Sequence, residues 1–233
     1  MPGMRIAVRI AVVLAAAVMS LAAYIVFPRR PDLRAFDPET MARTETLMWR
    51  HYYEKRYVAL FADLYGLSRR EFGFSPWDSL RIAIAAARAA RRFQPSTSRQ
   101  EADAALPMLR DYFGLLARAA PVPLDAEAAA RTELDWWQAR REAVRPEDYG
   151  LTIARVSTLL YGVDGEDVRT SGVLRAEAMA YRDARAADIR EADWNAIQDR
   201  LVAAYRLLKR AIGTPSPIEA GQALRSRPRL VTT

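Results

Sequence analysis

The sequence predicts an all-α protein, in which an N-terminal single transmembrane helix is followed by a soluble helical bundle of about six or seven helices. Two observations carry this prediction. Residues 10–27 form one apolar run without a charged side chain. Beyond this run, apolar residues recur at intervals of three and four, and no segment alternates apolar and polar residues between hairpin turns.

The composition excludes several classes of functional site. The 233 residues are 51% hydrophobic and 27% charged, which is a globular balance sufficient for one core or two small ones. The chain has no cysteine and one histidine, His51. This excludes disulfides, thiolate catalysis, zinc ribbons, iron–sulfur clusters and His-rich metal sites within one chain. No phosphate-loop, nucleophile-elbow or calcium-loop motif is present.

The first 27 residues are expected to form a short basic N-tail, 1–9, and a transmembrane signal-anchor helix, 10–27. At ~1.5 Å per residue the apolar run spans about 27 Å, close to the hydrocarbon thickness of a bilayer. A cleavable signal peptide is the alternative, because the segment Ser20–Ala22 resembles a cleavage site. The apolar run continues past that site to Phe27, which favours an uncleaved anchor.

The expected location is a bacterial-type inner (plasma) membrane, crossed once. Arginines flank both ends of the apolar run in nearly equal number, so the positive-inside rule hardly distinguishes the two orientations. Since a short basic N-tail usually stays inside, we favour an extracytoplasmic C-terminal domain.

Proline and capping residues divide the rest of the chain. Pro28 and Pro31 indicate a linker, 28–36, before an all-α domain, 37–213. The N-terminal signals are Asp37-Pro38, Ser75-Pro76, the capping boxes at Ser98 and Asp188, and Asp125. The termination signals are Gly66, Arg145-Pro146, Gly162 and Gly213, and Pro107 predicts a kink. The expected helices cover residues 38–65, 76–93, 98–119, 126–144, 147–160, 167–186 and 189–212.

The last helix shows its buried face most clearly, as a stripe at intervals of three and four. Beyond residue 213, three prolines and three arginines predict a disordered basic tail, 214–233. The stripe consists of Trp194, Ile197, Leu201, Ala204, Tyr205 and Leu208.

The first helix of the domain carries ionisable residues on two faces. His51 and Glu54 fall on one apolar face, whereas Glu45 and Trp49 fall on the opposite face, so this helix should be contacted on both sides. His51 and Glu54 are candidates for a ligand pair or an acid–base pair. The alternative is a histidine held by hydrogen bonds in a packed interior. A di-iron site is excluded, because it requires a second histidine.

A second unusual stretch places Glu133, Trp137 and Arg140 on one helix face. A buried carboxylate must be paired or protonated, so a buried ion pair is expected, with Arg140 able to reach Glu45 or Glu54. The alternative is a ligand pocket lined by tryptophan and arginine.

A third stretch aligns Arg175, Met179 and Arg182, either as a half-buried face paired with neighbouring carboxylates or as an anion site.

We predict no cofactor. A haem held by His51, or a metal held by carboxylates, are the alternatives. The conceivable second haem ligands are Met48, Met108 and Met179.

The net charge of +7 is concentrated at the chain ends. Residues 1–35 carry +4 and residues 214–233 carry +2, which leaves +1 for residues 36–213. This distribution gives no basic face for nucleic acid and fits the surface of a lipid bilayer better.

The leading functional hypothesis is a membrane-anchored binding or scaffold module that contacts a protein partner, a membrane complex or another copy of itself. One alternative is a cofactor-binding or enzymatic bundle, with its site around His51/Glu54 and Glu133/Arg140. Another is a lipid- or quinone-binding bundle. Without a recognisable nucleophile or metal motif, an enzyme is the less favoured class.

Overall fold

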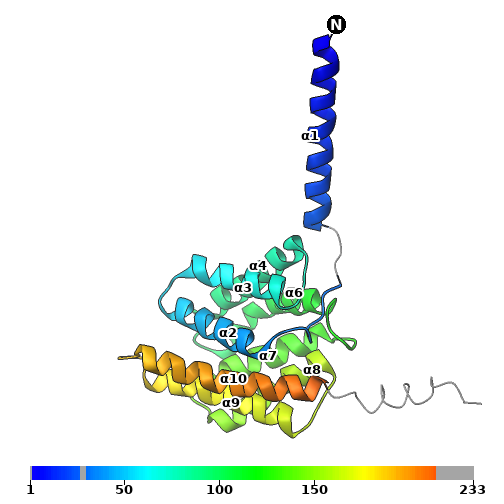
Figure 1. Cartoon of the computed structure of the whole chain (residues 1–233). Coiled ribbons are helices and arrows are strands. Elements are labelled where there is room, and N and C mark those ends of the chain that lie inside the picture. The colour runs from blue at the N-terminus through cyan, green and yellow to red at the C-terminus, as the bar shows by residue number, and fades with distance from the viewer. Residues whose placement is uncertain (1, 27–29, 214–233) are drawn as a thin grey trace, which may run out of the picture.

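The computed structural model describes residues 2–26 and 30–213, and Figure 1 shows their arrangement. All regular structure in these residues is helical, which confirms the all-α class. The expected disordered tail, 214–233, lies outside the described residues.

Helix α1 (Pro2–Val26) projects from one side of the helical domain (Figure 1). Its end touches the domain, where Arg69 Nη2 donates a hydrogen bond to the Tyr24 hydroxyl at 3.0 Å. Among the residues described, no helix combines the length and the apolarity needed to cross a membrane. The expected span, 10–27, ends at a residue outside the described range. The structure therefore confirms a helix here and gives no support to its transmembrane placement.

The domain consists of packed helical layers (Figure 1). The layer next to α1 contains α3, α4 and α6, and α2 and α7 lie beneath it. The far layer contains α8, α9 and α10, in which α9 packs against both neighbours. Helix α2 contacts both α3 and α10. The bounds are α2 (Pro38–Tyr53), α3 (Tyr57–Arg70), α4 (Pro76–Phe93), α5 (Arg99–Ala102), η1 (Asp103–Ala105), α6 (Leu106–Leu116), α7 (Ala126–Arg141), α8 (Pro146–Tyr161), α9 (Glu166–Ala184) and α10 (Glu191–Gly213).

Four of the predicted helix starts are confirmed by their caps. Asp37, Ser75, Ser98 and Asp125 each accept a hydrogen bond from a backbone N–H three residues later. The prediction at Asp188 is wrong. Helix α10 begins at Glu191, and the backbone N–H of Arg190 donates instead to Asp193 Oδ2 at 2.9 Å.

Two of the expected long helices are broken, so the domain has more helices than the six or seven predicted. Residues 38–65 form α2 and α3 around Lys55, whose φ of 59° lies in the left-handed region. Gly66 does not end a helix, because α3 continues through it to Arg70. Residues 98–119 divide into α5, η1 and α6. Pro107 lies in the first turn of α6, so it starts a helix rather than kinking one.

The described part of the expected linker, residues 30–36, is part of the core. Leu33 and Phe36 are 2% and 1% exposed. The backbone N–H of Leu33 donates to the Ala119 carbonyl at 3.0 Å, and that of Asp32 donates to the Phe72 carbonyl at 3.1 Å. Pro31 correctly indicated the absence of helix in this segment, but the segment packs as a strap across the domain.

The main core fills the space between the layers and includes five residues of the predicted stripe of α10, and all six members of that stripe, Ala204 among them, are buried. Helices α8 and α9 approach most closely at Gly150 and Gly172. A Cβ on Gly172 would lie 2.3 Å from the Gly150 carbonyl oxygen, so a side chain has no room there.

Candidate functional site

A buried ionic cluster joins three helices at the centre of the domain. Glu45 on α2 is 5% exposed, and Arg175 Nη2 on α9 donates to its Oε1 at 2.7 Å. The hydroxyl of Tyr205 on α10 donates to Glu45 Oε2. Burial lowers the pKa of Arg175, but Glu45, Tyr205 and Glu133 together outweigh this effect, and the pKa lies above its ordinary value. Glu45 and Arg175 therefore form a neutralised pair.

Glu133 on α7 is the second carboxyl group of the site, and it is half-buried. The indole N–H of Trp137 donates to Glu133 Oε1 at 2.9 Å, and within the described residues Glu133 forms no ion pair. Burial raises the pKa of Glu133, although hydrogen bonding and the charge of Arg175 oppose this effect. The environment of Glu133 thus favours the neutral acid.

The Glu45–Arg175 pair and Glu133 line the same cavity, which has a volume of about 320 Å³. Its walls come from α2, α3, α4, α6, α7, α9 and α10, and they are mostly aromatic and aliphatic. The polar wall residues are Glu45, Glu133 and Arg175, together with the hydroxyls of Tyr52, Tyr112 and Tyr205. The main apolar wall residues are Met41, Met48, Trp49, Leu60, Leu64, Leu67, Leu109, Trp136, Trp137 and Met179.

Two further hollows adjoin this cavity. One, of about 220 Å³, shares Trp49, Trp136 and Trp137 with the cavity and ends at Arg140 and Arg182. The other, of about 520 Å³, lies between α3 and α4 and shares aliphatic wall residues with the cavity. The shared walls are Leu60, Leu64 and Ala87, with Tyr52 and Ala90 common to all three spaces. Tyr52 and Ala90 therefore lie where the three spaces meet.

The structure does not bring His51 and Glu54 together. His51 Nδ1 lies 2.6 Å from Asp63 Oδ2 on α3. Glu54 caps the end of α2 and accepts a hydrogen bond from Arg50 Nε at 2.9 Å. In this arrangement His51 contributes to the contact between α2 and α3.

The partner of Arg140 also differs from the expected one. Arg140 binds the Asp183 carboxylate through Nε at 3.0 Å and Nη2 at 2.8 Å, rather than Glu45 or Glu54. It also donates to the Tyr53 hydroxyl. Burial opposes the charge of Arg140, but Tyr53 and Asp183 raise its pKa above the ordinary value. Arg140 consequently forms one edge of the smaller hollow, apart from Glu133.

Of the predicted residues, Glu45, Trp49, Glu133 and Trp137 meet in the central cavity. Tyr205 and Tyr112 were missed as site residues. The available signal for Tyr205 was its position on the buried stripe of α10, since a buried hydroxyl needs a partner. Arg175 was expected on a half-buried face and paired with a neighbouring carboxylate, but a single sequence does not reveal which carboxylate binds it.

Within residues 2–26 and 30–213, no three His, Asp or Glu side chains gather in a way that could hold a metal ion. Of the methionines considered for a haem, Met48 and Met179 line the central cavity, whereas Met108 lies in a groove between α4 and α6.

No protein-family model, curated protein or solved structure matches the chain. Its function must therefore be inferred from the geometry of the cavity and of the surface.

Proposed function

We propose that this protein is a membrane-anchored helical binding domain that takes up a ligand with an apolar body and a neutral hydrogen-bonding head, a class that includes quinones and neutral lipids. One observation carries the proposal. Glu133 is a half-buried carboxyl group without an ion-pair partner among the described residues, its pKa is raised, and it lines a mostly aromatic and aliphatic cavity.

The walls of the cavity favour a largely apolar ligand. Ligand sites are typically concave, mostly apolar and provided with a few convergent polar groups, with volumes of about 300–1,000 Å³. The central cavity, at about 320 Å³, lies at the lower end of this range, and its two neighbours extend the space available to a longer tail. Trp49, Trp136 and Trp137 offer flat surfaces against which a ring or an acyl chain can pack.

The polar groups favour a neutral head. Glu45 already neutralises Arg175, so an anionic head would meet a carboxylate rather than a free cation. Glu133 in its acid form donates a hydrogen bond, which suits a carbonyl or hydroxyl oxygen. The hydrogen bond from Trp137 to Oε1 holds the Glu133 carboxyl group in place at the cavity wall.

The anchor is supported by the sequence of residues 10–27 and by the projection of α1 from the domain (Figure 1). A single-pass anchor in a bacterial-type inner membrane, with the domain on the extracytoplasmic side, would place the cavity beside the phase in which such ligands dissolve. The enzymatic alternative gains less support, because His51 contacts Asp63 instead of Glu54.

The proposal is tested by titrating the purified full-length chain with two probes, decylubiquinone and monoolein, in calorimetry. The substitution Glu133→Leu removes the head-group contact while keeping an apolar wall. It should weaken binding of whichever probe binds the wild type by about tenfold or more. Asp135→Asn is the matched control, because Asp135 lies on the same helix but is exposed. The proposal fails if neither probe binds, or if Glu133→Leu binds as well as the control.

A further inference from the structure

The exposed apolar side chains of the domain concentrate on one layer. Within residues 30–213, the large apolar residues with substantial exposure number six, and four of them lie on α3 and α4. Val58 is 88% exposed and Trp77 is 47% exposed. The four are Tyr57, Val58, Trp77 and Ile84, and the other two are Leu47 and Leu151.

The same layer carries an excess of positive charge. Residues 55–92 contain eight basic and three acidic side chains. The three acids are already engaged: Asp63 with His51, Glu71 with a backbone N–H, and Asp78 with Arg118. No ion pair within the described residues involves five of the arginines, namely Arg70, Arg81, Arg88, Arg91 and Arg92. By contrast, all three arginines of α9 form ion pairs.

A groove between α4 and α6 is lined by both apolar residues and arginines. It encloses about 510 Å³, and Arg81 and Arg88 lie along it on either side of Ile84. Arg110 and Arg118 from α6 and the segment after it complete the basic lining, and both are paired with carboxylates. The lining also includes the carboxylate of Asp111, so Arg81 and Arg88 together still leave the groove net positive, beside the apolar side chains of Ile84, Met108 and Leu115.

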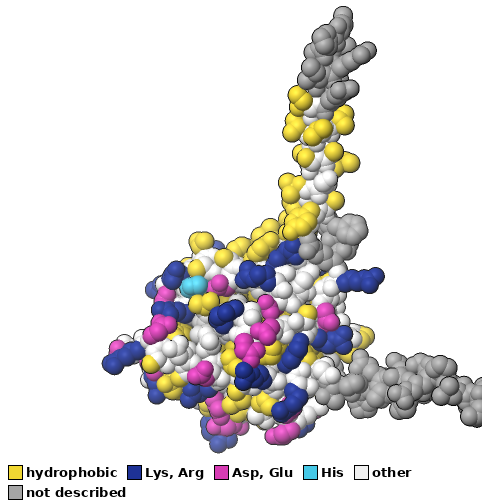
Figure 2. Space-filling model, in the orientation of Figure 1, with side chains coloured by type: hydrophobic (Ala, Val, Ile, Leu, Met, Phe, Trp, Pro, Cys, Tyr) yellow, Lys and Arg dark blue, Asp and Glu magenta, His cyan; other side chains and the backbone are white. Residues whose placement is uncertain are grey.

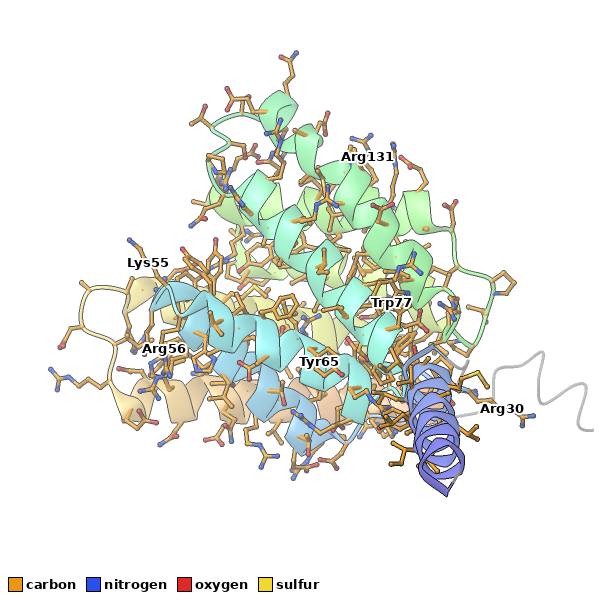
Figure 3. The ribbon with its side chains drawn as sticks, turned by 90° about the horizontal axis from the view of Figure 1, so that it is seen from above. Arg30, Lys55, Arg56, Tyr65, Trp77 and Arg131 are labelled. Carbon is orange, nitrogen blue, oxygen red and sulfur yellow. The ribbon has the colours of Figure 1, made fainter. Side chains whose placement is uncertain are left out.

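This layer is also the one from which α1 projects. Figure 3 views the domain along α1 and shows α3 and α4 nearest the viewer, with Tyr65 and Trp77 labelled on them. Figure 2 shows apolar side chains along the edge of the domain that leads to α1, and basic side chains beside the foot of that helix. An anchor at α1 would therefore hold this layer toward the bilayer.

We propose that the α3–α4 layer docks onto an anionic lipid surface, with Trp77, Val58 and Ile84 at the headgroup level and with Arg81 and Arg88 holding a phosphate-bearing headgroup. This proposal depends on the proposed anchor in one respect only, which is that the anchor would hold the domain close to a bilayer. Its own support is the coincidence of exposed apolar residues and unpaired arginines on one face.

The physical reasons are general. Tryptophan is favoured at membrane interfaces, and basic residues near the surface are attracted by anionic lipids. Arginine can keep its guanidinium at the phosphates while its methylene groups cover neighbouring apolar surface. This attraction is screened by salt, which separates it from simple apolar contact.

The test uses the full-length chain in nanodiscs whose lipids carry brominated acyl chains, which quench tryptophan fluorescence on contact. The difference in quenching between the wild type and Trp77→Phe isolates the contribution of Trp77. We expect this contribution to be large in discs of phosphatidylcholine with phosphatidylglycerol and to fall by about half or more in phosphatidylcholine alone or in high salt.

The double variant Arg81→Gln/Arg88→Gln should show the same loss in anionic discs, and Arg81→Lys/Arg88→Lys should retain most of the quenching. Arg43→Gln/Arg155→Gln is the matched control, since both arginines are exposed and without an ion pair in the described part of the chain, on α2 and α8. The proposal would be overturned if the quenching at Trp77 were the same in neutral and anionic discs and were unchanged in Arg81→Gln/Arg88→Gln. If the chain leaves the discs in high salt but binds them in low salt, the anchor fails while the docking surface stands.

Discussion

Tyr205, near the end of the domain, donates a hydrogen bond to Glu45 in its first helix, across 160 positions of sequence. With the ion pair from Arg175, this contact ties α9 and α10 to α2 around one carboxylate. The central cavity is built beside that cluster, so the same residues that close the bundle also form part of its polar wall.

Replacing Tyr205→Phe should destabilise the domain by about 1–3 kcal/mol, because a buried carboxylate loses a hydrogen-bond donor. The free energy of unfolding in urea measures this effect. Tyr57→Phe, at a 51% exposed tyrosine, is the control and should change little. Equal losses for the two variants would contradict the importance of the Tyr205–Glu45 contact.

Stability should depend on pH through Glu133. Because burial raises the pKa of Glu133, the folded domain holds this proton more tightly than the unfolded chain. The stabilising contribution is complete below the ordinary carboxyl pKa and declines as pH rises through the raised, folded pKa. The decline amounts to about 1.4 kcal/mol for each pH unit between the two values.

The Glu133→Gln variant should lack this decline. The free energies of unfolding of the wild type and the variant, measured from pH 4 to pH 8, a window of about four units, should therefore change relative to each other as the pH rises. Asp135→Asn serves as the exposed control and should follow the wild type. Parallel curves for wild type and Glu133→Gln would show that this carboxyl is not protonated preferentially in the folded state.

The contact between α8 and α9 should not tolerate a side chain at Gly172. Gly172→Ala forces a methyl group against the Gly150 carbonyl and should cost about 1–3 kcal/mol of stability. Gly114→Ala, within α6 and with open space around its Cα, should instead be neutral or stabilising by up to about 1 kcal/mol. Thermal unfolding of the pair checks the prediction, and a stable Gly172→Ala protein would rule out the tight helix contact.

The strap of residues 30–36 can be tested at Phe36. Since Phe36 is 1% exposed and its ring packs edge-on against Phe72 and Tyr205, Phe36→Ala should destabilise the domain by about 3–5 kcal/mol. Arg34→Ala, at an exposed position in the same strap, should have a small effect. A true linker would show no difference between the two variants.

Local signals predicted much of the fold. The caps at Asp37, Ser75 and Asp125 depend on neighbouring residues alone, so the helix starts could be read correctly. The break between α2 and α3 at Lys55 could not be predicted, because the apolar periodicity continues across it and the left-handed residue is neither glycine nor next to a proline. The strap was missed because prolines exclude helix without excluding packing.

The candidate site was predictable by residue type but not by pairing. Glu133 was expected in the interior because it shares a helix face with Trp137, and Glu45 was expected to be contacted because its helix carries apolar and ionisable residues on both faces. Which arginine neutralises which carboxylate depends on contacts 130 residues apart, and 33 of the 35 basic residues are arginine, so the sequence offers many equivalent choices. His51 and Glu54 were grouped by helical spacing, but α3 turns back and supplies Asp63 to His51 instead.

The burial of Leu33 also limits where the domain can travel. Leu33 follows the last residue of α1 by only seven positions, and an extended chain covers at most about 3.6 Å per residue. The core therefore begins within about 25 Å of the end of α1. The length of the connection therefore limits how far the domain can move away from the end of α1.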